Sequence, residues 1–454
     1  MKSLRNWCTG RRPVHYFHKG MAAALMFGAA AVAVPAPAAA QARPAAVTLA
    51  GQTVADFYKA RKNAPLWFGP RAGDAAQQLV ALLSTASIDG LNPDKYRAAA
   101  LQAAVENARV GDSSDVLRAD EQLSEAFAAY VRDLHQDPGI GFTYVDPVLR
   151  PKPPSALAAL IQAANAPSLS DYVSNLRWMH PFYGELRQAV TQHKYSSDEQ
   201  RALIEINLQR ARALPSFRDR YILVNAAQQR LYMYENGKPV DSMRVVVGKP
   251  KYPTPMMSAL VRFASLNPYW FVPPDLAADR IAPNVVKRGL KYLDELGYQV
   301  LDEWSENPTI IDPSTVDWKA VAEGKVEVRM RQLPGPHNAM GRMKFMFPNE
   351  EGIYLHDNPD RGLFEQASRL YSGGCVRLED AARLGRWMFG RDLVWETVGT
   401  EHKMPLAAPI PVHITYLTAM PDGSSITFLD DVYGRDKAQL AASGVSASSS
   451  GASR

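Results

Sequence analysis

The sequence is poor in cysteine, with only two in 454 residues. Cys8 lies in the basic opening segment, and Cys375 lies far along the chain. A chain with one cysteine in its body cannot form a framework of intramolecular disulfides, which excludes the disulfide-rich secreted scaffolds. A single thiol of this kind is a buried small apolar residue, an intermolecular crosslinker or a nucleophile. Its neighbours in the sequence must decide among these three.

The sequence also lacks a long apolar run and the common metal or cofactor motifs. Its most hydrophobic stretch, "MAAALMFGAAAVAV", is short and rich in alanine, so it spans a bilayer poorly. There is no HExxH, no CxxC and no phosphate-binding glycine loop, so we expect no metal and no cofactor. The net charge of +5 comes from Lys and Arg residues dispersed among acids, which is not a nucleic-acid signature. A basic chain of this kind suits an anionic partner such as a cell-wall polymer.

The first forty residues predict a secretory signal peptide over residues 1–40. A basic segment precedes the apolar run, and small residues in "PAPAAA" offer a cleavage site. The pair Arg11 and Arg12 raises the alternative of twin-arginine export, but a proline follows it, and general export fits better; a membrane anchor is the other alternative. Cleavage would remove Cys8 and leave Cys375 without an intramolecular partner. We therefore expect a periplasmic protein with no membrane span after cleavage.

Hydrophobic periodicity divides the remaining chain into two parts. Residues 41–215 carry apolar residues at helical spacing, interrupted by glycine and proline, and predict packed helices. Residues 216–436 carry short runs rich in Val, Ile, Leu and Tyr, two of them joined at Asn236-Gly237, a strong hairpin signal. We expect an α+β protein in which a helical domain precedes a mainly-β domain.

Two further segments stand apart from this division. Residues 275–331 predict a helical element inserted between the strands of the β-rich domain. Residues 437–454 are low in complexity and rich in serine, alanine and glycine, so we expect a disordered tail.

The stretch "YSGGCVR" gives Cys375 a distinctive setting. Gly373 and Gly374 allow the backbone to approach a ligand closely, and the N–H of Gly374 could stabilise an oxyanion beside the thiol. The alternative is an ordinary glycine turn before the helix predicted in "EDAARLGRWMF". The glycines alone do not separate these two interpretations.

A nucleophilic thiol needs a base, because free cysteine has a pKa of about 8.5 and the thiolate is the reactive form. His356 ends the predicted strand "GIYLH" shortly before Cys375, and an intervening loop could bring the two together. Adjacent side chains of a strand point to opposite faces, so the backbone carbonyl of Asp357, rather than its carboxylate, is expected to orient the imidazole. A structural histidine is the alternative, but the sole cysteine of the chain body favours a catalytic dyad.

The segment "YLHDNPDRGLFEQASRLYSGGCVRLED" resembles the catalytic segment of the L,D-transpeptidases. In that family a histidine is followed, after a loop, by Ser, a small residue or His, Gly, Cys, any residue, and Arg or Asn. "IDGLNPDKY", "NPYWFVPP" and "PGPHNAMGRMKFMFPN" extend the likeness toward the family's large multidomain subgroup. The resemblance implies a helical scaffold, a mainly-β catalytic domain and a helical capping insert over residues 275–331.

The resemblance also implies a reaction and a substrate. Cys375 would attack the L-centre carbonyl of diaminopimelate in a peptidoglycan tetrapeptide stem, release D-alanine, and pass the acyl group to the amine of a second stem. The expected product is the 3-3 crosslink, and carbapenems are expected to acylate the thiol. The alternatives are 1-3 crosslinking from an L-alanine donor, attachment of a lipoprotein, release of crosslinks, a cell-wall cysteine peptidase, and a non-catalytic wall-binding protein.

Substrate contacts follow from the same motif. Arg377 could bind substrate carboxylates, with a surface arginine as its alternative. The other candidates, for which structural packing is the alternative, are Ser372, Gly373, Tyr354, Asn338 and Arg342.

Two departures from the family pattern matter. Gly373 stands where many members have histidine. The chain also has too few residues between "HPFYGELRQAV" and "EINLQRARALP" for the usual peptidoglycan-binding module. The oligomeric state is not predicted.

Overall fold

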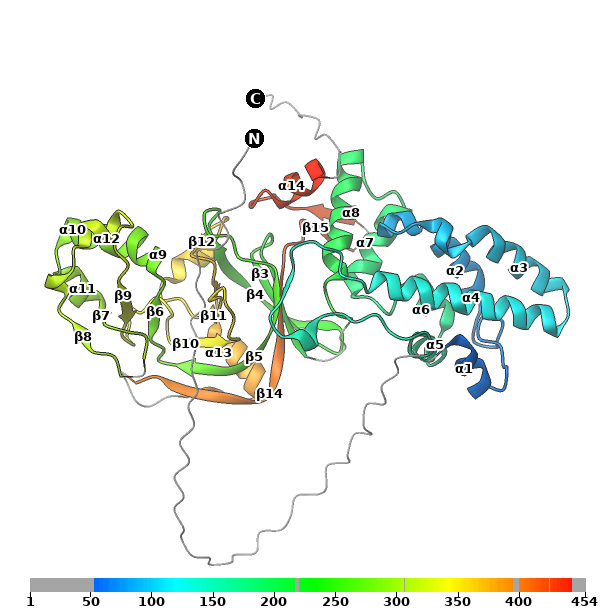
Figure 1. Ribbon diagram of the computed structural model, residues 1–454, viewed down its shortest axis with the longest axis horizontal. Coiled ribbons are helices and arrows are strands. Elements are labelled where there is room, and N and C mark those ends of the chain that lie inside the picture. Colours follow the sequence, from blue (N-terminus) through cyan, green and yellow to red (C-terminus); the bar gives the residue numbers. More distant parts are fainter. Residues whose placement is uncertain (1–52, 217–219, 306, 395–399, 424, 443–454) are drawn as a thin grey trace, which may run out of the picture.

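The structure is a computed structural model with three parts that follow one another along its longest axis (Figure 1). The predicted signal peptide lies outside the residues that it describes. No helix among those residues is long and apolar enough to cross a membrane. The described residues are 53–216, 220–305, 307–394, 400–423 and 425–442.

The N-terminal part is the predicted helical scaffold. Its elements are α1 (Val54–Ala60), α2 (Ala75–Ser84), η1 (Ala86–Asp89), η2 (Pro93–Tyr96), α3 (Ala98–Val110), α4 (Ser113–Leu134), β1 (Thr143–Tyr144), η3 (Pro147–Leu149), α5 (Ala156–Ala164), α6 (Leu169–Ser174), α7 (Pro181–Thr191) and α8 (Asp198–Arg212). The longest helix, α4, starts at a capping box in which Asp112 and Asp115 each accept a backbone N–H of the other. Leu123, Phe127 and Leu134 then follow at helical spacing and are buried in the scaffold core.

Residues 41–215 are not wholly helical, because they include one strand of the central sheet. Strand β1 pairs in parallel with β5 (Met257–Leu266), and the hydroxyl of Tyr144 donates to the carbonyl of Ala213. This strand is too short to show a period of two, so the sequence did not reveal it.

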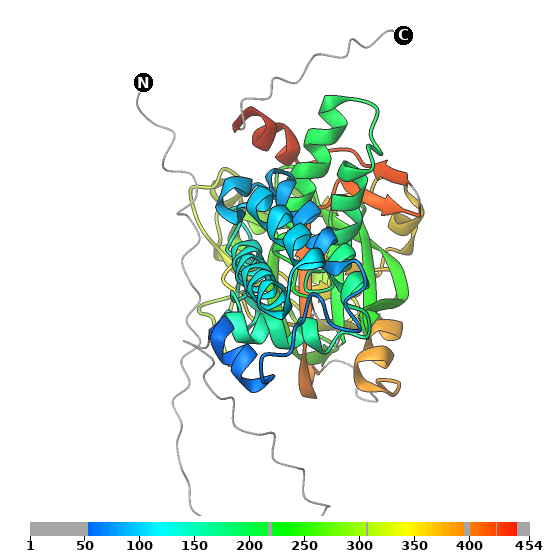
Figure 2. The ribbon, with the colours of Figure 1, turned by 90° about the vertical axis from the view of Figure 1, so that its right-hand side faces the viewer.

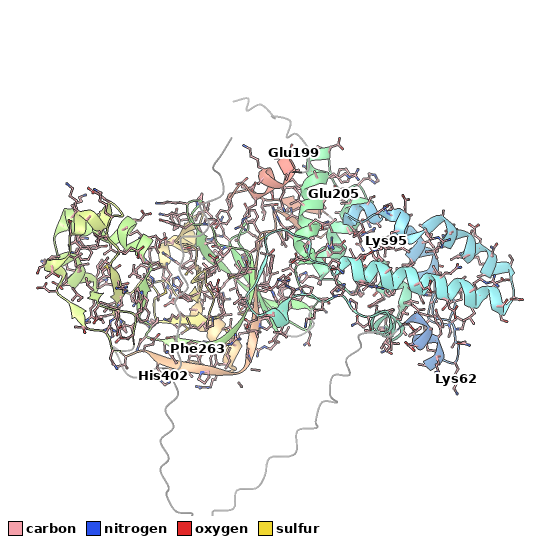
Figure 3. All side chains as sticks on the ribbon, viewed as in Figure 1. Lys62, Lys95, Glu199, Glu205, Phe263 and His402 are labelled. Carbon is pink, nitrogen blue, oxygen red and sulfur yellow. The ribbon has the colours of Figure 1, made fainter. Side chains whose placement is uncertain are left out.

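The central part is the predicted mainly-β domain, whose strands form a sheet of ten strands among the described residues. Strand β14 pairs with both β2 and β5, so the sheet closes on itself. Figure 3 shows Phe263 and His402 where β5 and β14 run together. Besides β1 and β5, its elements are β2 (Tyr221–Asn225), β3 (Arg230–Glu235), β4 (Lys238–Gly248), β10 (Met343–Met346), β11 (Leu355–His356), η6 (Arg361–Glu365), β12 (Leu370–Ser372), β13 (Val376–Leu378), α13 (Ala381–Phe389) and β14 (His402–Thr415).

The chain returns to the scaffold after the sheet (Figure 2). Hairpin β15 (Ala419–Asp422) and β16 (Ser425–Phe428) packs on the helical core, and α14 (Arg435–Ala442) packs on α8. Arg210 of α8 forms a buried ion pair with Asp436, with Nη1 2.6 Å from Oδ1. The predicted disordered tail was therefore placed too early, because residues 437–442 belong to α14. Residues 443–454 lie outside the described part.

The third part is the capping insert, which the sequence predicted as helical. It also contains a four-stranded sheet in the order β6-β9-β7-β8, so the insert is mixed α/β. Its strands have two to four residues, too few for a readable alternation. The elements are β6 (Trp270–Val272), α9 (Pro274–Leu276), η4 (Ala277–Ile281), α10 (Ala282–Arg288), α11 (Lys291–Leu296), β7 (Tyr298–Leu301), β8 (Ile310–Ile311), η5 (Pro313–Thr315), α12 (Trp318–Ala322) and β9 (Arg329–Gln332).

Candidate active site

Cys375 lies in a tight turn between β12 and β13. Side chains bind this turn from both sides: Thr254 Oγ1 donates to the carbonyl of Gly374 at 2.8 Å, and Ser372 Oγ donates to the carbonyl of Cys375 at 2.6 Å. Ser372 Oγ also accepts the N–H of Gly374 at 3.1 Å. Hydroxyl groups commonly stabilise such turns by bonding to nearby backbone atoms. The turn therefore holds the thiol in one place.

These bonds bear on two of the predicted roles, which stay predictions. Ser372 is only 2% exposed, and its hydroxyl bonds within the turn. The N–H of Gly374 already donates to Ser372, so it is not presented to an oxyanion in this conformation. Both observations have the same physical cause, a side chain that bonds to its own turn.

Both glycines of the turn are required by geometry. Gly374 has a φ of +117°, a conformation that side chains disfavour. A Cβ added at Gly373 would lie 2.9 Å from Cδ1 of Leu276 in the cap. The space that a histidine would need at residue 373 is thus occupied by the cap. Gly373 therefore lies directly beneath the cap, where a larger residue would collide with Leu276.

The thiol itself is half-buried. Sγ of Cys375 lies 3.5 Å from the carbonyl oxygen of Gly352, to which the thiol can donate. No disulfide involves this cysteine among the described residues. Cys375 is thus a reduced and partly accessible thiol, as a nucleophile has to be.

His356 is buried at the end of β11. Its Nδ1 lies 2.6 Å from the backbone carbonyl oxygen of Asp357, the contact that the sequence predicted. A carbonyl can only accept, so the hydrogen belongs to Nδ1 and Nε2 carries the lone pair. Burial, with a smaller contribution from the charge of Arg377, lowers the pKa of His356 to about 3, while the backbone of Asp357 and of Met340 opposes this shift. The imidazole is therefore neutral and able to accept a proton.

Strand register places the histidine and the cysteine on one face of the sheet. In the parallel pair of β11 and β13, His356 lies opposite Arg377 and Leu355 lies opposite Val376. Leu355 and Val376 point into the apolar core, so His356 and Arg377 point to the other face. Cys375 immediately precedes Val376, the first residue of β13, so the alternation of the strand turns its side chain toward the face that carries His356 and Arg377. The fold therefore places the two predicted members of the dyad on neighbouring strands and on the same face of the sheet, and their joint action stays a prediction.

Arg377 is half-buried beside the predicted dyad. Burial, helped by the charge of Arg280, lowers the pKa of Arg377 to about 10, and the charges of Cys375 and Asp360 oppose this shift. Its Nη1 donates to Oδ1 of Asn358 at 3.3 Å. Its buried Nε has no acceptor among the described residues. Arg377 is thus a charged group in the site with an unused donor, rather than a surface arginine.

The carboxylate of Asp357 points away from the imidazole. It accepts from Arg361 Nη2 at 2.8 Å and from the backbone N–H of Arg342 at 2.9 Å. The side chain of Arg342 is exposed, and its contact with a substrate stays a prediction.

Two other predicted substrate contacts have different surroundings. Asn338 is buried, and its side-chain amide nitrogen donates to backbone carbonyls of Pro268, Gln332 and Leu333. It therefore ties together the two chain segments at the base of the cap, and its contact with a substrate stays a prediction. Tyr354 is partly buried against the apolar core of the cap, two residues before His356, and its substrate contact stays a prediction.

Sequence reasoning missed Lys344, Asn358 and Leu276. Lys344 in β10 lies directly opposite His356, on the side away from Arg377. The one signal for it is a lysine inside the otherwise apolar strand "MKFMF". Asn358 binds Arg377, and Leu276 covers Gly373; neither contact has a local signal, because both depend on the folding of distant segments.

A buried neutral imidazole beside a half-buried thiol, on the same face as an arginine with a free donor, defines a cysteine acyltransferase site. Comparison with known proteins supports this class. Residues 219–401 match the model of the L,D-transpeptidase catalytic domain, and residues 52–190 match the model of its scaffold domain.

One relative and two solved structures extend the comparison. A Haemophilus influenzae protein named as an L,D-transpeptidase is 28% identical over 396 residues, which cover 85% of this chain and 78% of the relative. An L,D-transpeptidase from Mycobacterium smegmatis is 12% identical with a TM-score of 0.20, covering 43% of this chain and 58% of that structure. A mutant L,D-transpeptidase from Enterococcus faecium is 13% identical with a TM-score of 0.19, covering 44% of this chain and 52% of that structure. The chain thus spans little more than half the length of these two structures.

The chain thus carries a scaffold domain followed by an L,D-transpeptidase catalytic domain, and it is an enzyme of the acyltransferase class. The predicted order of a helical scaffold followed by a mainly-β catalytic domain is confirmed.

Proposed function

We propose that the protein crosslinks peptidoglycan stem peptides in the periplasm through a thioester on Cys375, and that its main product is the 3-3 crosslink. The observation that carries this proposal is the placement of Cys375, His356 and Arg377 on one face of the sheet, next to the cap. The family match supports a peptidoglycan substrate, and the basic leader followed by a short apolar run supports export.

The proposed first step forms the thioester. Sγ of Cys375 attacks the L-centre carbonyl of diaminopimelate while the thiol proton passes to His356. The tetrahedral intermediate then collapses, the bond to the nitrogen of D-alanine breaks, and His356 returns the proton to that nitrogen. In the second step the amine of another stem attacks the thioester, His356 takes a proton from the amine, and the sulfur leaves and is protonated. The neutral state of His356 suits it to both proton transfers.

Arg377 is proposed to position the donor stem. A guanidinium binds carboxylates with two parallel hydrogen bonds, and the stem carries the carboxylate of its terminal D-alanine and that of diaminopimelate. The partner of Arg377, Asn358, fixes one end of the side chain and leaves the buried Nε available. This arrangement would register the stem over the thiol.

One observation favours 1-3 crosslinking as a second candidate. Helices α7 and α8 are joined by residues 192–197 alone, so the wall-anchoring module that the subgroup usually carries there is not between them. The register of the stem over the thiol then depends on the cap and Arg377, and a changed register would select the L-alanine carbonyl. Small errors of position change rates by orders of magnitude, so one donor should dominate.

The test is to incubate the purified protein with disaccharide-tetrapeptide and to sequence the dimers by tandem mass spectrometry. We expect dimers that have lost only D-alanine and that join position 3 to position 3. Dimers in which the donor has lost everything beyond L-alanine would establish the 1-3 product instead. Absence of any dimer, with the wild-type protein shown to be folded by circular dichroism, would contradict the proposed function.

A further inference from the structure

A row of side chains crosses three neighbouring strands on the face that carries the dyad. Lys344 in β10 lies opposite His356 in β11, and His356 lies opposite Arg377 in β13. Residues that pair directly across neighbouring strands project from the same face. The imidazole therefore has a cation on each side, and the mechanism above uses only Arg377.

The ammonium group of Lys344 is buried in a setting that suits its charged form. The residue is 7% exposed, and its Nζ lies 3.2 Å from Oε1 of Glu401 and donates to the carbonyl of Tyr269 at 3.2 Å. The hydroxyl of Ser265, which pairs with Lys344 across β5, bonds to the same carboxylate. An ammonium group can only donate, and these neighbours accept. Burial lowers the pKa of Lys344, and Glu401 opposes this shift.

We propose that Lys344 is a positioning residue for the dyad that acts through its positive charge. With Arg377, it stabilises the thiolate of Cys375 as the proton leaves the sulfur. It also makes the imidazolium of His356 a stronger acid. This role deepens the proposed function and rests on it for its purpose. In thioester formation the proton moves from sulfur to His356 and then to the nitrogen of the departing amine, and Lys344 itself neither gains nor loses a proton.

Mutual electrostatic effects within the row support this role. The charge of Cys375 raises the pKa of Lys344 and that of Arg377, so the sulfur and both cations act on one another. Coulomb interactions are reciprocal, so each cation favours the thiolate by as much as the thiolate favours the charged form of that cation. After burial and Arg377, the charge of Lys344 also lowers the pKa of His356. An imidazolium formed between two cations therefore releases its proton readily to a departing amine.

Other charged groups near the dyad have to be weighed against Lys344. Glu401 reduces the field of the ammonium but also holds it in place. Lys403 is two residues away in β14 and pairs with Ser265, but it is exposed, and solvent screens its charge. The other charged groups near the row are Arg280 of η4, Asp357 and Asp360 of the loop after β11, Arg361, which pairs with Asp357, Glu401, and Lys403 of β14.

The experiment measures the reactivity of the thiol and needs no peptidoglycan. Full-length wild-type protein and the variants Lys344→Met, Lys344→Gln and Lys344→Arg are alkylated with iodoacetamide across a range of pH. Modification of Cys375 is followed by peptide mass spectrometry, which separates it from Cys8. In both neutral variants we expect the rate profile to shift to higher pH by about one unit, a tenfold slower reaction near neutral pH, at the low end of the effect of one neighbouring opposite charge. Lys344→Arg should stay close to the wild type.

Controls separate charge from packing. Lys403→Met removes an exposed charge near the row and should leave the profile unchanged. Lys344→Gln keeps an amide donor for the carbonyl of Tyr269, so it carries the test if Lys344→Met does not fold. A wild-type profile in a folded neutral variant would overturn the proposal, as would a shift in Lys344→Arg as large as in Lys344→Gln. A shift in the neutral variants of a protein that forms no dimers would instead reject the proposed function and leave the role of Lys344 intact.

Discussion

The cap meets the nucleophile turn at Gly373, and a substitution there tests whether this contact matters. An added Cβ would lie 2.9 Å from Cδ1 and 3.2 Å from Cδ2 of Leu276. Carbon atoms in favourable contact are about 3.5 to 4.0 Å apart. In Gly373→Ala, either Leu276 has to change its conformation or the cap has to lift from the turn.

The magnitude follows from the cost of overpacking a filled site, about 1 to 3 kcal/mol. If the overpacking destabilises only the position in which Leu276 contacts the turn, the fraction of molecules with the cap in that position falls. We therefore expect kcat/KM to fall about tenfold, since about 1.4 kcal/mol corresponds to a factor of ten. The assay is the release of D-alanine from tetrapeptide substrate. Gly362→Ala is the matched control, because an added Cβ there has only one neighbour within 4 Å, at 3.4 Å.

A double-mutant cycle makes the prediction specific to the contact. Leu276→Ala removes the two methyl groups that the new Cβ would meet, so Gly373→Ala should have little effect in that background. Residues in contact commonly show coupling energies of about 0.5 to 3 kcal/mol. The reasoning fails if Gly373→Ala is as active as the wild type, or if it lowers activity equally with and without the side chain of Leu276.

Three further predictions concern pH, the arginine and the thiol. Burial lowers the pKa of His180 and of His413 to about 3, so between about pH 6.5 and 3 the folded chain binds fewer protons than the unfolded chain. The free energy of unfolding should therefore fall as the pH drops through this range. The urea midpoint of His413→Gln should fall less on acidification than that of the wild type, and an equal fall would refute this. Asn358→Ala should lower kcat/KM about tenfold, because Arg377 loses the acceptor that holds its side chain. Asn358→Asp keeps an acceptor oxygen and should keep most of the activity. An alanine variant as active as the wild type would argue against a positioning role for Asn358. A carbapenem should add its mass to Cys375 in intact-protein spectra, and an unmodified wild type would count against the thioester mechanism.

The chemistry of the site was readable from the sequence because it is local. His356, Cys375 and Arg377 lie within one short segment, and the contact from Nδ1 to the Asp357 carbonyl follows from the alternation of a single strand. The change from helical to β periodicity near residue 216 likewise depends on neighbouring residues only. These features need no knowledge of which distant segments meet.

The features that the sequence did not reveal depend on long-range pairing or on the detail of one turn. Lys344 joins the row because β10 pairs with β11, and Leu276 covers Gly373 because the cap folds back over the sheet. The bonds of Ser372 were not foreseen for a different reason: its hydroxyl can bond either to a ligand or to its own turn, and composition does not distinguish these. Residue type alone therefore does not show which polar groups bond within the fold.

The central claim is that one thiol and one imidazole carry the reaction. The most direct measurement is dimer formation from disaccharide-tetrapeptide by wild-type protein, Cys375→Ala and His356→Ala, each shown to be folded by circular dichroism and thermal unfolding. We predict crosslinked dimers and free D-alanine from the wild type and neither product above background from the two variants. Dimers from a folded Cys375→Ala protein would contradict the account.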